Sequence, residues 1–166
     1  MSVSTAPRSR RTEIVMAGLR VMLGLLFLSV WGSNLNKGLY GPDQYAALID
    51  GYVADGDAPA PWKDVMRFVA EEAAVFSKLQ LAGELALGVL LIVGLFTRLA
   101  GFAAWIYLSA LWVSEIGVPN EWIWSLVFPA LAAFAVAWLP EAQAFSLDER
   151  VRDRPPFDRL PRWASG

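Results

Sequence analysis

The sequence predicts an all-α fold: an integral membrane four-helix bundle with an amphipathic helical loop on the outer side, between the first and second spans. Of the 166 residues, 56% are hydrophobic and 18% are charged, which is too apolar for a soluble domain of this length. Four separate segments are also long enough, or nearly so, to cross a hydrocarbon core that requires about 20 residues. These two observations predict a small multi-pass membrane protein.

The first predicted span covers residues 14–32. Arg8, Arg10 and Arg11 precede it and give it a superficial likeness to a signal peptide. A cleavable apolar region is only about 7–15 residues long and is followed by small residues at the cleavage site. The segment here is longer and ends near Trp31, so we expect it to be retained as a span.

The loop at residues 33–78 separates the first two spans and is predicted to be helical. After Pro42, a residue suited to the first turn of a helix, apolar side chains recur at helical spacing: Tyr45, Leu48, Ile49 and Tyr52. A second amphipathic stretch starts near Pro61 and runs without a breaker into the second span, with one apolar face: Trp62, Val65, Met66, Val69, Ala73 and Phe76. We expect it to cap the outer mouth of the bundle or to extend the second span, and the alternative is a plain interfacial anchor.

The other three spans are predicted at residues 79–96, 99–116 and 122–139. Short joins, Thr97–Arg98 and residues 115–121, make these spans antiparallel neighbours, as in an up-and-down bundle. Pro129 should bend the last span near its middle. Small residues within these spans predict close helix packing: Gly83, Gly88, Ala100, Ala104, Ala133 and Ala137.

Basic residues are distributed unevenly between the two sides of the membrane, which predicts the orientation. Four lie on the side of the long loop: Lys37, Lys63, Arg67 and Lys78. Nine lie on the other side: Arg8, Arg10, Arg11, Arg98, Arg150, Arg152, Arg154, Arg159 and Arg162. We therefore expect a plasma membrane protein with both termini in the cytoplasm, where residues 1–13 form a basic segment and residues 140–166 a charged, peripheral tail.

The composition also limits the chemistry. The chain has no Cys and no His, which excludes disulfides and Cys metal sites and removes the usual haem ligand. No metal site is predicted, and the formal net charge of −2 argues against a nucleic acid partner. Any reaction must therefore use carboxylates, Tyr, Lys, Arg or a bound cofactor.

Two ionisable side chains, Arg20 and Glu84, lie well inside the predicted spans. An ionisable group at the bilayer centre costs about 2.5–3.5 kcal/mol and normally faces the bundle interior. Side chains lean toward the N-terminus of their helix, so Arg20 leans inward and Glu84 leans outward. We expect Glu84 to meet Asn34 or Lys37, or a water-filled cavity beneath the cap. Arg20 either reaches the inner interface or joins the polar pocket.

Two segments carry a family resemblance. They are "LRVMLGLLFLSVWGSNLNKG" at residues 19–38 and "GELALGVLLIVGLFTRLAG" at residues 83–101. Together they resemble the DoxX/DoxD family of four-helix membrane proteins over residues 17–139. The resemblance implies a subunit associated with membrane oxidoreductases, because DoxD is the small subunit of a thiosulfate:quinone oxidoreductase. With no Cys and no His in the chain, any electron carrier would be a bound quinone or would belong to a partner subunit.

The resemblance gives the polar and aromatic residues of the spans a second interpretation. Candidates for a polar pocket or quinone site are Glu84, Lys37, Asn34, Arg20, Trp105 and Tyr107. Ordinary packing or a place in the interfacial aromatic belt is the preferred explanation of the two aromatic residues, and a packing hydrogen bond would explain Glu84 equally well. Arg98 lies where the orientation rule favours a cation, and it also suits a lipid or quinone head group.

We therefore expect a DoxX/DoxD-like membrane subunit associated with a quinone-linked oxidoreductase complex, not catalytic alone and without a covalent cofactor. Its partners would be membrane lipids and other protein subunits. The alternative is a non-catalytic helical subunit that anchors or fills a larger membrane assembly. A small-solute transporter is the least favoured class, because four spans with two internal ionisable residues offer little for alternating access.

Overall fold

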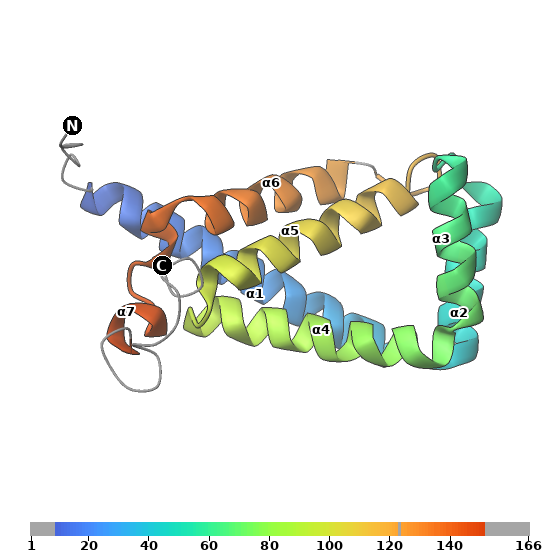
Figure 1. Ribbon diagram of the computed structural model, residues 1–166, viewed down its shortest axis with the longest axis horizontal. Coiled ribbons are helices and arrows are strands. Elements are labelled where there is room, and N and C mark those ends of the chain that lie inside the picture. The colour runs from blue at the N-terminus through green and yellow to red at the C-terminus, as the bar shows by residue number, and fades with distance from the viewer. Residues whose placement is uncertain (1–8, 123, 152–166) are drawn as a thin grey trace.

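The computed structural model describes residues 9–122 and 124–151, and this part of the chain contains helices and loops but no strand, which confirms the all-α class. Several arginines used for the orientation lie outside the described residues: Arg8, Arg152, Arg154, Arg159 and Arg162. The described helices are α1 (Arg10–Asn36), α2 (Pro42–Asp55), α3 (Ala60–Glu71), α4 (Ala73–Val93), α5 (Thr97–Ser114), α6 (Trp124–Trp138), the 3-10 helix η1 (Pro140–Gln143) and α7 (Leu147–Val151) (Figure 1).

The four long helices form two closely packed pairs. α1 packs against α4, and α5 packs against α6. Small residues permit both contacts: a Cβ on Gly88 of α4 would lie 2.6 Å from Leu28 Cδ2 of α1, and a Cβ on Gly101 of α5 would lie 2.8 Å from the backbone nitrogen of Ala137 of α6. α4 and α5 are antiparallel and in contact, as predicted for the second and third spans, but each packs more extensively on another helix.

The two pairs diverge from one end of the molecule to the other (Figure 1). We call the end that is covered by α2 and α3 the cap end, and the opposite end, with the turn between α4 and α5, the turn end. The pairs are close at the turn end and separate toward the cap end. A pocket lies beneath the cap, where the pairs are separated.

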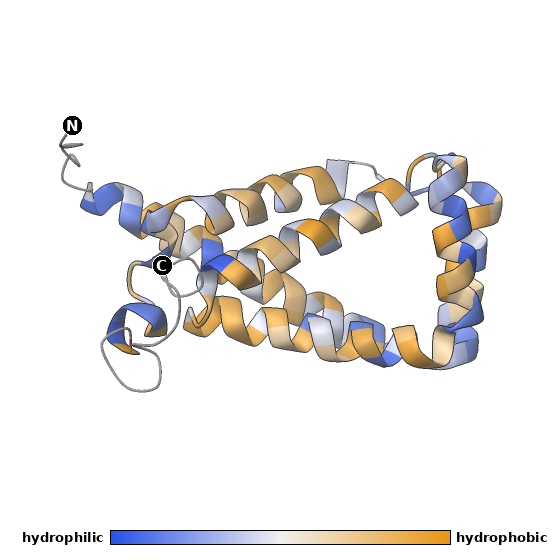
Figure 2. Ribbon diagram, viewed as in Figure 1, coloured by the Kyte–Doolittle hydropathy of each residue, from blue (hydrophilic) through white to orange (hydrophobic). Residues whose placement is uncertain are grey.

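The long helices expose many large apolar side chains. Val15 of α1, Ile106 of α5 and Phe128 of α6 are each more than 60% exposed. Figure 2 shows hydrophobic residues along all four long helices, with hydrophilic residues concentrated in α2, α3, α7 and the start of α1. By length and composition, α1 and α4 could cross a membrane, and α6 is a shorter apolar helix. An apolar surface of this kind suits lipid rather than water.

The join between α4 and α5 is formed by residues 94–96, one turn earlier than the predicted Thr97–Arg98 join. Gly94 ends α4 in the left-handed conformation, with φ of 69°. Arg98 lies instead in the first turn of α5, where its Nε donates a hydrogen bond of 3.2 Å to the carbonyl oxygen of Ala137 at the end of α6. Arg98 therefore helps to fasten the pair of α5 and α6 at the turn end.

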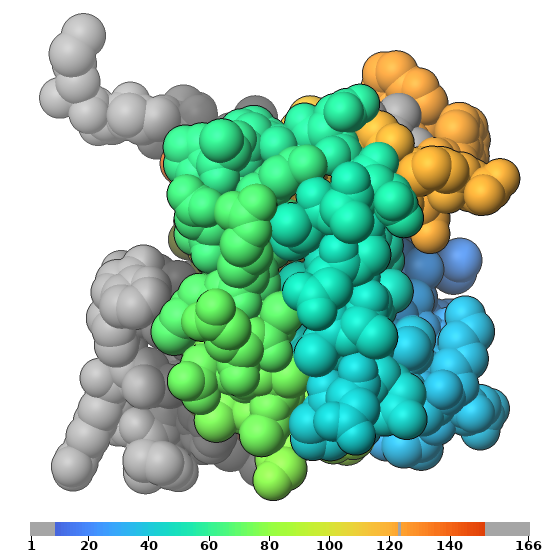
Figure 3. Space-filling model, turned by 90° about the vertical axis from the view of Figure 1, so that its right-hand side faces the viewer, coloured from blue at the N-terminus to red at the C-terminus, as the bar shows by residue number. Residues whose placement is uncertain are grey.

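α2 and α3 lie across the cap end, side by side, as Figure 3 shows. Their buried cluster contains Tyr45, Ile49, Met66, Ala70 and Ala73. Two bonds attach this cap to the end of α5: Trp62 Nε1 donates to Ser114 Oγ at 2.9 Å, and the Asp57 amide donates to the Ile116 carbonyl at 2.6 Å. Of the two predicted arrangements, the structure has the cap.

Two details of the predicted cap are wrong. The helix does not run unbroken into the second span, because α3 ends at Glu71 and α4 begins at Ala73, with Glu72 between them at φ −98° and ψ 28°. This break turns α3 across the cap end of the bundle. Val65 does not belong to the buried face, since its side chain is 47% exposed.

The segment after α6 closes the turn end. Asp148 of α7 is buried, and its two oxygens accept hydrogen bonds from the Phe96 and Thr97 amides at 2.8 and 2.7 Å. These amides begin α5, which has no local side-chain cap, so the carboxylate serves as its cap from a distance. The beginning of the predicted peripheral tail is therefore part of the packed structure.

Candidate functional site

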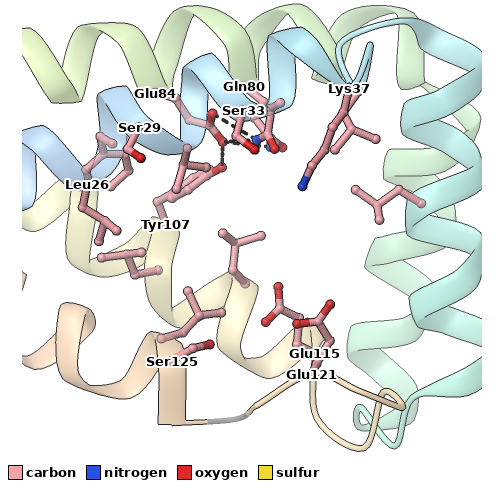
Figure 4. Close-up of a pocket in the computed structure, with 18 of the residues that line it drawn as sticks. Leu26, Ser29, Ser33, Lys37, Gln80, Glu84, Tyr107, Glu115, Glu121 and Ser125 are labelled. Atoms are coloured by element: carbon pink, nitrogen blue, oxygen red, sulfur yellow. Dashed lines mark hydrogen bonds between the residues drawn. The ribbon is translucent and has the colours of Figure 1, made fainter.

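A pocket of about 580 Å³ lies beneath the cap, where the two helix pairs diverge. Its volume falls within the roughly 300–1,000 Å³ that small-molecule sites occupy. Its walls come from α1, α2, α4, α5 and the start of α6 (Figure 4). The apolar part of the wall includes Phe27, Ile49, Leu108 and Leu111. Polar side chains gather at two places. We call the region around Glu84 the floor, and the region around Lys37, Glu115 and Glu121 the mouth.

The floor of the pocket is the carboxylate of Glu84, whose side chain is 1% exposed. Gln80 Nε2, one turn earlier on α4, donates to Glu84 Oε1 at 2.9 Å, and the Tyr107 hydroxyl of α5 donates to the same oxygen. The Tyr40 hydroxyl, from the loop after α1, donates to Oε2 at 2.5 Å, and Asn34 Nδ2 of α1 lies 3.3 Å from that oxygen. Four donors from four segments therefore converge on one carboxylate.

Glu84 has no ionic partner within the described part of the chain, where the ion pair found joins Arg67 to Asp64 on the exposed face of α3. An ionised carboxylate only accepts hydrogen bonds and has about four lone-pair sites, so the four donors match its capacity. Burial, with the hydrogen bond and charge of Glu84, raises the pKa of Tyr40 above its ordinary value. The Tyr40 hydroxyl therefore keeps the proton that it donates.

Charged side chains surround the mouth. Lys37, just after α1, points into the pocket, and Glu115 and Glu121 lie across from it in the loop that follows α5 (Figure 4). The Tyr52 hydroxyl of α2 lies 3.5 Å from Glu115 Oε1. Burial and the charge of Glu121 raise the pKa of Glu115 to about 7. The mouth therefore carries a carboxyl group that changes its charge near neutral pH.

Most of the chain matches a single protein family. The family model described as "TQO small subunit DoxD" matches residues 15–156, which is 142 of the 166 residues. The chain belongs to the DoxD family. No curated protein and no solved structure matches the chain. The family's description as a small subunit agrees with the expectation of a membrane oxidoreductase subunit that has protein partners.

The structure of this DoxD protein brings together four of the predicted site residues. Asn34 and Tyr107 donate to Glu84, and Lys37 lines the same pocket without an ion pair to Glu84. The predicted contact between Glu84 and Asn34 is present. Lys37 is left with its charged group facing the pocket, where it is available to a ligand.

The remaining predicted residues lie outside the DoxD pocket. Arg20 is buried at the turn end, where its Nη2 is 3.5 Å from the Phe145 carbonyl oxygen and Asp148 attracts its charge. It does not line the polar pocket beneath the cap, because it lies at the opposite end of the bundle. Trp105 packs on Phe134 of α6 with ring centroids 5.4 Å apart, away from the pocket.

Other residues that line the pocket or contact Glu84 were not among the sequence candidates. Gln80 precedes Glu84 by one helical turn, and this spacing was a signal that could have identified it. Tyr40 follows a turn at Gly38, where φ is 70°, and nothing in the local sequence indicates that its ring returns to α4. Glu115 and Glu121 enter the pocket through the loop after α5, whose path depends on its contact with the cap.

Proposed function

We propose that this chain is a four-span membrane subunit of a quinone-linked oxidoreductase complex, and that the pocket above Glu84 receives the head group of a quinone. The single observation that carries this proposal is the buried carboxylate of Glu84, held by four donors at the floor of a pocket of about 580 Å³. If Glu84 only packed between helices, it would need neither four hydrogen-bond donors nor an adjacent cavity.

The proposed spans are α1, α4, α5 and α6, which together form a four-helix membrane domain within residues 14–139. Their exposed apolar side chains support contact with lipid. In this arrangement the cap faces the outside, and the turn end faces the cytoplasm together with both termini. Described basic residues at the turn end favour that orientation: Arg10, Arg11, Arg98 and Arg150.

A quinone head group suits the chemistry of the pocket. Phe27, Leu108 and Leu111 provide apolar walls for a ring, and the Lys37 ammonium group can donate to a carbonyl oxygen. When bound, a quinone would supply a carrier of two electrons and two protons. Glu115 and Glu121 lie together at the mouth, and Glu84 lies at the opposite end of the pocket (Figure 4).

The residues of the chain have separate roles in this proposal. Lys37 binds a carbonyl oxygen, and Glu84 accepts or holds a proton at a carboxylate oxygen. Gln80 and Tyr107 keep the carboxylate oriented toward the pocket. The apolar walls exclude water from the ring. Any electron acceptor or donor belongs to a partner subunit, in agreement with the family's description as a small subunit.

Binding of decylubiquinone to the detergent-solubilised protein, followed through quenching of Trp fluorescence, tests this proposal. Glu84→Gln and Lys37→Met should each weaken binding roughly 10-fold or more, since a hydrogen bond to a charged group contributes about 1.5–3 kcal/mol. Lys78→Met is the matched control, because Lys78 is exposed on α4 and does not line the pocket.

Absence of saturable binding would contradict the proposed quinone site. It would favour the second candidate function, a helical subunit that anchors a larger assembly. One observation supports this candidate: α6 exposes a row of large apolar side chains at helical spacing, namely Trp124, Phe128, Leu131 and Trp138. Copurification of a larger subunit that depends on this row would support it directly.

A further inference from the structure

The pocket is closed on most sides and open on one. The residues that line it from α2, α4 and α5 are all buried or half-buried. The exposed lining residues come instead from α1 and its end, from the loop before α6 and from the start of α6: Ser29, Val30, Ser33, Lys37, Glu121 and Ser125. The opening therefore lies between α1 and α6.

The arrangement of the helices explains this opening. Toward the turn end, η1 fills the space beside α1 and α6, so the two helices are joined there. Toward the cap end they belong to diverging pairs and separate (Figure 1). On the opposite side of the pocket, Gln80 and Tyr107 bridge α4 and α5 through Glu84. Figure 4 shows Leu26 and Ser29 on α1 and Ser125 on α6, at opposite walls of the pocket.

The opening lies at the depth of the membrane rather than above it. Ser29 is seven residues before the end of α1 at Asn36, which is about 10 Å along the helix axis. Ser125 is the second residue of α6, and the exposed Trp124 precedes it. A Trp at such a position is typical of the level of the lipid head groups. The open side therefore faces the outer leaflet in the proposed orientation.

The opening has two parts that differ in chemistry. The mouth beneath the cap carries Lys37, Glu115 and Glu121, and an apolar chain would have to displace the water around these charges. The side opening is lined by Leu26, Val30 and Leu126, with small serine hydroxyls at its edge. It can accommodate an apolar tail while the polar floor holds a head group.

We propose that the pocket is loaded sideways from the outer leaflet, between α1 and α6, and that its ligand is an amphiphile whose apolar tail remains in this opening. The inference rests on the proposed function, since it takes a quinone ring as the head group. It adds that the quinone must carry a long apolar tail and that it reaches Glu84 without passing through water.

The absence of Cys from the chain allows a specific test in lipid vesicles. Ser125→Cys and Ser29→Cys, each modified with a bulky maleimide, place an obstacle at either side of the opening. Val89→Cys with the same adduct is the control, because Val89 is exposed on α4 and lies outside the pocket. The two probes are ubiquinone-10 in the vesicle membrane and tail-less ubiquinone-0 in the water.

We expect the adducts at Ser125→Cys and Ser29→Cys to weaken or slow binding of ubiquinone-10 at least 10-fold. Binding of ubiquinone-0, which can use the charged mouth, should change less than 2-fold and shows that the modified protein is folded. Undiminished ubiquinone-10 binding, or an equal loss of both probes, would overturn the side entry while leaving the proposed function intact. If neither probe binds the unmodified protein, the proposed function fails and this inference fails with it.

Discussion

The hydroxyl of Tyr107 offers a direct measure of the charge on Glu84. Tyr107→Phe removes one donor from the buried carboxylate and keeps the ring, whose centroid lies 5.7 Å from that of Phe27. A hydrogen bond to a charged acceptor contributes about 1.5–3 kcal/mol, whereas a neutral pair contributes about 0.5–1.5 kcal/mol. If Glu84 is ionised, the substitution should therefore lower the free energy of unfolding by about 1.5–3 kcal/mol.

The substitution is best measured in a double-mutant cycle with Glu84→Gln, using Trp fluorescence during unfolding in mixed micelles. The cycle isolates the interaction between the two side chains from other effects of each change. Tyr45→Phe is the matched control, because Tyr45 is also a buried tyrosine near the pocket but makes no hydrogen bond through its hydroxyl to Glu84. It should cost clearly less than Tyr107→Phe.

A coupling energy below about 0.5 kcal/mol would refute the reasoning, since it would mean that Tyr107 and Glu84 do not share a strong bond. An equal loss of unfolding free energy in Tyr45→Phe would also refute the reasoning, because the loss would then follow from removing the hydroxyl of any buried tyrosine. A coupling of about 1 kcal/mol would indicate a neutral Glu84.

Three further predictions concern the mouth, the turn end and the orientation. Glu115→Gln should stabilise the protein at pH 8 but not at pH 4. Because the pKa of Glu115 is raised to about 7, the folded state keeps a proton that the unfolded state releases from about pH 4.5 upward. The free energy of unfolding of the parent protein therefore falls as the pH rises from about 4.5 to about 7. Melting temperatures across this range check it, and an equal gain at pH 4 would contradict it. Asp148→Asn should cost about 2–4 kcal/mol, because one of two amides loses its acceptor and the cap of α5 loses its charge; unchanged thermal unfolding would contradict this. In whole cells, an impermeant thiol reagent should label Ala47→Cys on the exposed face of α2 and spare Ser9→Cys before α1, and the reverse pattern would invert the topology.

The sequence was most informative where a residue conflicts with its surroundings. Glu84 could be singled out because a carboxylate within an apolar helix requires partners, and the outward lean of its side chain pointed toward Asn34 and Lys37, where the chain leaves the first span. Gln80 followed the same helical spacing and was overlooked. Tyr40 could not be predicted, because its place at Glu84 depends on the turn that leads from α1 into the cap.

Contacts between distant segments account for the remaining errors. The close pairing of α1 with α4 depends on how a surface of small residues meets a complementary surface, which the short connections between the spans do not reveal. The break between α3 and α4 at Glu72 contains neither Gly nor Pro, so the sequence does not indicate it. It lies where the chain turns from the cap into α4. Arg20 was expected either at the inner interface or in the polar pocket. It does not line the pocket, and Asp148, 128 positions later in the chain, attracts its charge.

That separation between Arg20 and Asp148 also sets an order of events during synthesis. α1 is made first and carries a buried guanidinium group whose attracting carboxylate does not yet exist. At roughly 5–20 residues per second, the ribosome needs on the order of 6–26 s to add the 128 intervening residues. During this time the turn end of the protein stays open, and α5 has no cap for its first amides. The last described helix to be translated therefore completes the environment of the first.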